Sequence, residues 1–112
     1  MVEREVTYMK TKLTKKEIAT IEKETVFSVE EQDDGYSFGW YTNAGEDFSF
    51  EVSKGMDILF YITQYCYDFD AEEHAGSWYG ANRGEPGLRA LLEDADEIKE
   101  ELLKLASVVE SF

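Results

Sequence analysis

The alternation of hydrophobic and polar residues predicts three β-strands in the first half of the chain. These segments are Val26–Glu31, Tyr36–Tyr41 and Asp47–Val52. A period of two is expected of a strand that buries one face and exposes the other to water. The sheet should therefore bury a single, largely aromatic face, made by Phe27, Val29, Phe38, Trp40, Phe48, Phe50 and Val52.

Short segments of turn composition separate these strands. Asp33-Asp34-Gly35 follows the first strand, and Asn43-Ala44-Gly45 follows the second. Gly, Asn and Asp tolerate the positive φ angles that tight hairpins require. The sequence therefore predicts an antiparallel meander, which has three strands, or four if residues 4–11 add another. Residues 1–12 are open to two interpretations, a strand or a flexible arm.

Helical periodicity predicts helices before and after the meander. The first runs over 15–23 and begins at a capping box, Thr14-Lys15-Lys16-Glu17. The second runs over 54–67 with Ser53 as its N-cap. Its apolar residues cover a wide arc, which indicates burial between the sheet and another element. Those residues are Met56, Leu59, Phe60, Ile62 and Cys66.

Two further helices are predicted near the C-terminus. Asp70 can cap a short helix that carries His74, Ala75 and Trp78, and a loop over 80–87 follows. The last helix, over about 87–110, has the strongest periodicity. Its apolar stripe comprises Leu88, Leu91, Ala95, Ile98, Leu102, Leu105, Val109 and Phe112.

The stripe on the last helix allows two interpretations. A strict heptad seam can form a coiled coil, so a homodimer through 88–112 is one of them. Leu92, Leu103 and Ala106 widen the stripe, however, which favours packing on the protein's own sheet and a monomer. The predicted fold class is α+β: an antiparallel meander packed against two or three helices, including a long C-terminal one.

Length and composition indicate one domain over residues 1–112. The single cysteine excludes an intramolecular disulfide, so a reducing, cytoplasmic setting is expected. The N-terminus has no apolar run of the kind found in signal peptides. No stretch approaches the ~20 apolar residues that span a bilayer, so no membrane association is expected.

The charge of the chain indicates which classes of partner it can bind. The formal net charge is −14, and residues 24–112 carry only five Lys or Arg against 21 Asp or Glu. Such a field repels nucleic acid and anionic membranes and attracts basic surfaces. The sequence therefore predicts no direct binding of nucleic acid, and it predicts a basic protein surface as the partner.

The segment from Asp68 to His74 is the densest candidate for a metal site. Asp68, Asp70 and Glu72 stand at positions 1, 3 and 5 of a calcium-binding loop. The match then fails, because Glu73 stands where Gly is needed and Tyr79 where Glu is needed. Capping of a helix explains these acids better, so neither a metal nor another cofactor is expected.

Catalytic chemistry has little support in the sequence. Cys66 and His74 could pair as nucleophile and base, but no third residue is evident to orient them. Cys66 also lies on an apolar helix face, and His74 is expected to stack on Trp78. The Gly-rich stretches over 76–80 and 80–84 match no phosphate-binding spacing. The sequence therefore predicts a protein that is not an enzyme and has no catalytic residues.

Parts of residues 46–106 resemble a loose group of small acidic bacterial proteins, many of them carried on mobile genetic elements. The resemblance rests on Asp47–Val52, Tyr65, Asp68-Phe69-Asp70, Glu73-His74-Ala75, Trp78, Gly84, Pro86 and Leu91–Lys99. No activity is attached to that group, so the resemblance implies no functional residue. It implies a bacterial protein in a mobile-element setting.

These observations favour a non-enzymatic acidic protein-binding domain. The most specific version of this hypothesis is a nucleic-acid mimic, in which carboxylates replace phosphates in the basic cleft of a partner. The candidate carboxylates are Glu30, Glu31, Asp33, Asp34, Glu46, Asp47 and Glu51. Trp78 and Tyr79 form a candidate contact patch, because aromatic residues are favoured at interfaces. The alternative is a small-molecule-binding protein or enzyme with a site near residues 68–84.

Overall fold

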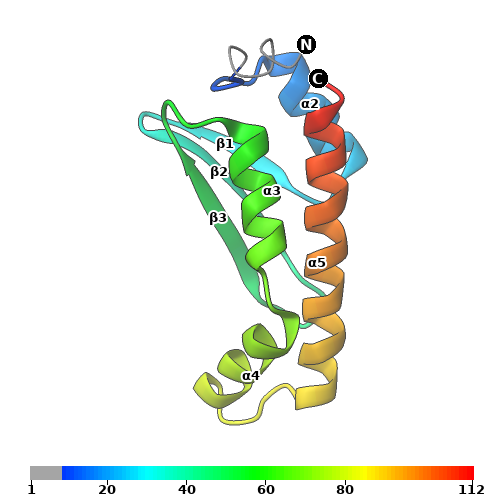
Figure 1. The fold of residues 1–112 in the computed structure, drawn as a ribbon. Helices are drawn as coiled ribbons and strands as arrows, with labels where there is room; N and C mark the ends of the chain where they lie inside the picture. Colours follow the sequence, from blue (N-terminus) through cyan, green and yellow to red (C-terminus); the bar gives the residue numbers. More distant parts are fainter. Residues whose placement is uncertain (1–8) are drawn as a thin grey trace.

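The computed structural model describes residues 9–112, and it confirms the predicted α+β class. The three-stranded antiparallel meander has the order β1-β2-β3, and helices cover one of its faces (Figure 1). The strands are β1 (Ser28–Gln32), β2 (Gly35–Tyr41) and β3 (Asp47–Ser53). The helices are α2 (Lys15–Glu24), α3 (Ile58–Asp68), α4 (Ala71–Ala81) and α5 (Leu88–Glu110).

The register of the sheet confirms the predicted buried face. Val29 of β1 lies opposite Phe38 of β2, which lies opposite Phe50 of β3. Phe27, Phe38, Phe48, Phe50 and Val52 are buried, Val29 and Trp40 pack against them, and Tyr36 joins the same core. Ser49 and Glu51 are exposed on the opposite face. The helices therefore cover the aromatic face, and the polar face is in contact with water.

The start of α2 follows the predicted capping box. The Thr14 hydroxyl accepts the Glu17 backbone N–H at 3.1 Å, and a Glu17 side-chain oxygen accepts the Thr14 N–H at 2.9 Å. These two bonds satisfy backbone donors that the first helical turn leaves free. The strand or arm predicted over 1–12 lies largely outside the described residues, and residues 9–14 belong to no helix or strand.

The predicted start of the next helix is wrong. Ser53 ends β3 instead of capping a helix, and residues 54–56 turn the chain before α3 begins at Ile58. Gly55 has a φ of 88° in this turn, a value that glycine adopts without steric cost. The predicted buried arc of this helix is also too wide, because Met56 and Phe60 are exposed. The buried stripe of α3 consists of Ile58, Ile62 and Cys66.

Helix α5 packs against both hydrophobic cores of the protein. Ile98, Leu102, Leu105 and Val109 belong to the main core, together with the sheet, α2 and α3. Leu91 and Ala95 form a second core with Ala75 of α4, and Trp78 packs against it. The apolar stripe that could have formed a coiled-coil seam is therefore buried within the chain over Leu91–Val109, whereas Leu88 and Phe112 at its two ends are exposed.

The molecule is elongated along α5. It measures 49 × 27 × 24 Å, with a radius of gyration of 15.3 Å. A compact chain of this length would have a radius of gyration of ~13 Å. The sheet and α2 lie toward one end of α5, and α4 packs beside its other end (Figure 1).

We predict that replacing Phe38 with alanine lowers the free energy of unfolding by about 3–5 kcal/mol, because a fully buried aromatic side chain leaves a cavity. Phe60→Ala is the matched control, since the same side chain is mostly exposed there, and it should change that free energy by less than about 0.5 kcal/mol. Urea denaturation followed by circular dichroism measures both. Equal losses in the two variants would contradict the described burial.

Candidate functional site

The junction between α3 and α4 lies against α5. The Lys99 ammonium on α5 donates hydrogen bonds to the backbone carbonyls of Cys66 and Phe69, the latter at 3.0 Å. A cation at this position satisfies carbonyls that the end of a helix leaves free. Asp70 then caps α4, as predicted, by accepting the backbone N–H groups of Glu72 and Glu73 at 3.1 Å each.

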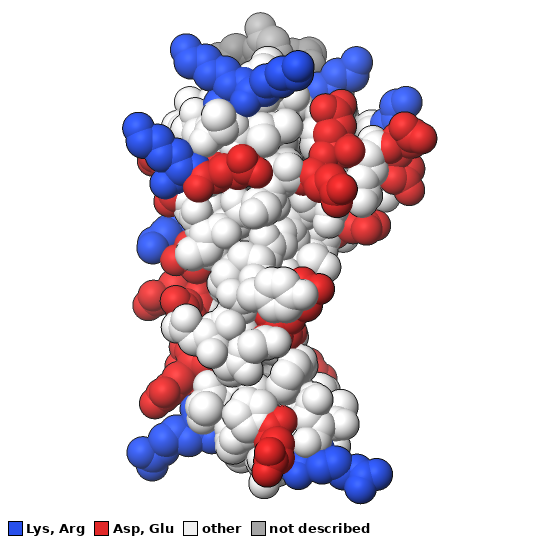
Figure 2. All heavy atoms as spheres, turned by 180° about the vertical axis from the view of Figure 1, so that it is seen from behind, with Lys and Arg blue, Asp and Glu red and all other residues white. Residues whose placement is uncertain are grey.

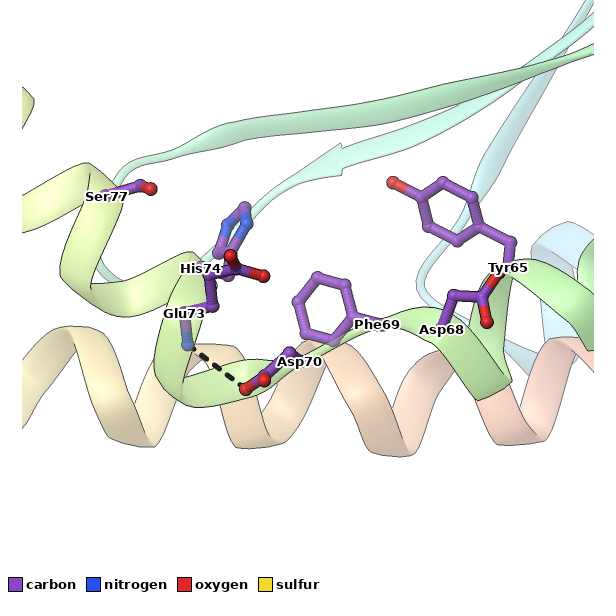
Figure 3. A pocket seen from close by; sticks show the side chains of 7 residues that line it. All are labelled: Tyr65, Asp68, Phe69, Asp70, Glu73, His74 and Ser77. Carbon is purple, nitrogen blue, oxygen red and sulfur yellow. Dashed lines mark hydrogen bonds between the residues drawn. The ribbon is translucent and has the colours of Figure 1, made fainter.

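A pocket of about 380 Å³ opens at this junction. Its volume lies within the ~300–1,000 Å³ that is typical of ligand sites. In Figure 3, Tyr65 from the end of α3 faces His74 and Ser77 from α4, and the Phe69 ring lies between them. We call this the junction pocket, lined by Tyr65, Asp68, Phe69, Asp70, Glu73, His74 and Ser77.

A partly buried pair, His74 and Glu46, lies at the wall of the junction pocket. His74 Nε2 lies 2.9 Å from both oxygens of Glu46. A carboxylate can only accept, so this nitrogen carries a proton and donates it. Glu46 precedes β3, and the contact therefore ties the β2–β3 loop to α4. The Phe48 and Phe69 rings pack against the imidazole, in place of the predicted stacking on Trp78.

On the aromatic side of the pocket, the ring of Tyr65 packs against neighbouring rings. Tyr65 stacks on Phe50 of the sheet, with ring centroids 4.4 Å apart, and also on Tyr61 one turn earlier. Burial raises the pKa of the Tyr65 hydroxyl, and Tyr61 and the Glu46 carboxylate raise it further. Tyr65 therefore stays neutral at physiological pH, where it can offer both a hydroxyl donor and a π-face.

The residues that could act as nucleophiles are not paired with a base. Cys66 is buried, and this burial raises the pKa of its thiol, which disfavours the reactive thiolate. Ser77 lines the same pocket as His74, but no hydrogen bond joins the two side chains in the described part of the chain. Within residues 9–112, no group of three or more His, Cys, Asp or Glu side chains could hold a metal ion.

The structure does not gather the seven predicted carboxylates on one surface. Glu30, Asp47 and Glu51 share the polar face of the sheet, because Glu30 and Glu51 both lie opposite Ser37. Asp33 and Asp34 form the exposed turn between β1 and β2. These five positions match the exposure that the sequence predicted.

Two of those carboxylates lie elsewhere. Glu31 pairs with Tyr36, whose ring belongs to the buried face, so Glu31 extends from the opposite side of the sheet. Glu46 is only 8% exposed and is bonded to His74, so the prediction of a surface contact there is wrong. The physical reason is that a hydrogen bond from the His74 imidazole compensates the buried carboxylate, which the local sequence does not reveal.

The predicted aromatic patch is also divided. Trp78 is half-buried and packs against the second core, where it helps to hold α4 to α5. Tyr79 is exposed, and its hydroxyl lies near Gly84 in the loop after α4. Sequence reasoning instead missed Tyr65 and Phe69 as pocket residues. Their only signal was the proximity of two aromatic residues to the Asp68–His74 segment.

None of three comparisons, with protein-family models, with curated proteins and with solved structures, found a match to this chain. The resemblance to small acidic bacterial proteins stays a prediction. Among the described residues, no helix combines the length and the hydrophobicity that are needed to cross a membrane.

We predict that His74→Ala lowers the free energy of unfolding by about 1.5–3 kcal/mol, because it leaves the buried Glu46 carboxylate without its donor. Glu46→Gln should cost less, since the amide oxygen can still accept from the imidazole. Glu73→Gln, on an exposed position beside the same pocket, serves as the control and should change little. Urea titrations compare the three. If His74→Ala is as stable as the control, the hydrogen bond between His74 and Glu46 is not formed in solution.

Proposed function

We propose that this protein is a binding domain for a positively charged protein surface, and that the junction pocket accepts a basic side chain of that surface. The observation that carries the proposal is the composition of the pocket. Its seven lining residues include three carboxylates and two aromatic rings, and neither Lys nor Arg is among them. Such a site has the features that a guanidinium or an ammonium group requires.

The carboxylates supply the charge complementarity. Asp68, Asp70 and Glu73 belong to the end of α3 and the start of α4, and all three are exposed. Asp70 uses one of its oxygens to cap α4, and its other oxygen makes no hydrogen bond within the described residues. Charge-assisted hydrogen bonds from Arg or Lys to carboxylates are among the stronger polar contacts in proteins.

The aromatic rings favour a cation over a purely polar group. Tyr65 and Phe69 both line the pocket and are held by packing against the sheet. A cation above an aromatic face gains about 0.5–2 kcal/mol from the ring quadrupole. A rigid ring also loses little conformational entropy on binding. These features support a binding site for one basic side chain.

The charges on the rest of the surface support a basic partner. On the face seen in Figure 2, acidic side chains lie along both sides of the elongated body, and basic ones gather at its two ends and also lie along one side. One end is that of α2, with its three lysines, and the other is that of the α4–α5 loop, with Arg83 and Arg89 nearby. The excess of acidic side chains between the two ends attracts a basic partner.

The narrower hypothesis of nucleic-acid mimicry has less support. It requires carboxylates arranged in two dimensions over one surface, whereas Glu46 is buried and Glu31 extends from the other side of the sheet. An uncharged strip also separates the acidic side chains in Figure 2. We place the binding in a reducing, cytoplasmic setting, which one buried cysteine supports.

The proposal predicts that a short peptide of alternating arginine and glycine binds this protein, and that the affinity falls steeply between about 0.05 M and about 0.5 M NaCl. Asp68→Asn combined with Glu73→Gln should weaken binding about tenfold, because two charges are lost from the pocket. Isothermal titration calorimetry measures the affinity. The ring signals of His74 in NMR spectra should shift on binding, because His74 lines the pocket.

The matched control is Asp33→Asn combined with Asp34→Asn, which removes the same charge from the β1–β2 turn. This variant should bind nearly as well as the unaltered protein. If both double variants weaken binding equally, the peptide responds to net charge alone and the pocket is not the site. Absence of binding at low salt would overturn the proposed function itself.

A further inference from the structure

The outer face of α3 is uncharged although the chain is rich in charge. Charged residues make up 32% of the sequence, yet the ten residues from Ile58 to Tyr67 contain none. Only Ile58, Ile62 and Cys66 of this helix are fully buried. A surface helix normally carries charged or polar residues on the side away from the core. Over residues 58–67 helix α3 carries no charge on that side, and its exposed polar residues there, besides Tyr67, are Thr63 and Gln64.

Two large aromatic side chains lie on the outer face. Phe60 is 64% exposed and Tyr67 is 82% exposed. They are seven residues apart, which places them on one side of the helix, two turns from each other. Thr63 lies between them on the same side and is exposed as well. Neither aromatic ring packs against another ring within the described residues.

Helix α5 extends this apolar surface. Helices α3 and α5 lie side by side and run in opposite directions (Figure 1). Lys99 contacts the end of α3, whereas Glu110 lines a pocket together with Leu59 from the start of α3. Leu103, one turn after Lys99, is therefore on the side of α5 that faces α3. Leu103 is 56% exposed. We call Phe60, Thr63, Tyr67 and Leu103 the α3 face.

The charges that border the α3 face indicate what can cover it. Asp68 ends α3, and Glu100 lies on the exposed side of α5 near Leu103. At the start of α3, Asp57 lines a pocket together with Lys10 and Lys12, so the acidic excess lies toward the end of the helix. Asp68 also lines the junction pocket, so the face leads around α3 into that site. A second copy of this chain would bring these like charges together, whereas a partner with basic residues around an apolar strip would neutralise them.

We propose that the α3 face binds an amphipathic segment of a basic partner. Apolar side chains of that segment contact Phe60, Tyr67 and Leu103, and its basic side chains meet the surrounding acids. One of these basic side chains is placed to enter the junction pocket. The inference rests on the proposed function for the charge of the partner. It adds the apolar contacts by which the same partner would be bound.

The test compares two synthetic peptides of identical composition. One has leucines on one side of a helix and lysines on the other, and the second has the same residues in an order that forms no apolar side. The first should bind about tenfold more tightly, because it alone can cover the α3 face while it meets the acids. Isothermal titration calorimetry with the full chain measures both affinities.

Single substitutions assign the contact to the α3 face. Phe60→Ser and Tyr67→Ser should each remove most of the difference between the two peptides. Tyr41→Ser is the matched control, because Tyr41 is 71% exposed on the polar face of the sheet, far from α3. It should leave the difference unchanged. Thermal unfolding verifies that all three variants fold, as expected for exposed positions.

The possible outcomes separate this inference from the proposed function. Equal affinity for the two peptides would contradict the proposal that the α3 face binds an amphipathic segment. The arginine–glycine peptide tests the charge requirement of the proposed function independently. Equal binding of an amphipathic peptide with glutamate in place of lysine would overturn the charge argument. If sedimentation shows a dimer of the free protein that Tyr67→Ser dissociates, the face is a contact between copies and the inference is wrong.

Discussion

The fold depends on one shared surface, the apolar stripe of α5. Ile98, Leu102, Leu105 and Val109 close the main core, and Leu91 and Ala95 close the second. A helix of 23 residues is ~35 Å long, which exceeds what the small sheet alone can cover. Helix α4 packs on the remaining length. The position of α4, and with it the junction pocket, therefore follows from the length of α5.

Buried polar side chains then determine how the loops lie on this frame. On α5, Glu101 accepts the Val26 backbone N–H at 3.3 Å, and Asp94 accepts the Ala44 N–H at 3.1 Å. Both carboxylates are buried, where an unpaired charge would be costly, so each restricts the segment that donates to it. The second oxygen of Asp94 has no hydrogen-bond partner within the described residues.

The proposed binding of a basic partner uses two kinds of surface, which act on different steps of binding. Exposed carboxylates act over a distance and speed the encounter with a basic partner, but water and salt screen them. Aromatic and aliphatic contacts act only at close range and slow dissociation. Asp68 lies where the two surfaces meet, because it follows Tyr67 of the α3 face and lines the junction pocket. A partner held in this way would be selected by its charge and its shape together.

Several features of the fold could be predicted because their causes are local. The alternation in 47–52 specifies which strand face is buried, and the pairing of Thr14 with Glu17 specifies where α2 starts. The stripe on α5 likewise identified a long helix with one buried side. In each case the interacting residues are neighbours in the sequence, so the pattern itself carries the information.

The candidate site was decided by tertiary structure. Glu46 and His74 are 28 residues apart, and they meet only because the β2–β3 loop lies against α4. The hydrophobicity of α3 suggested burial on a wide arc, yet Phe60 and Tyr67 face outward. Periodicity shows which residues share a side of a helix, but it does not show whether a neighbouring element covers that side. By itself the sequence determined the elements and the charge of this protein, and the packing of α4 and α5 decided which side chains form its site.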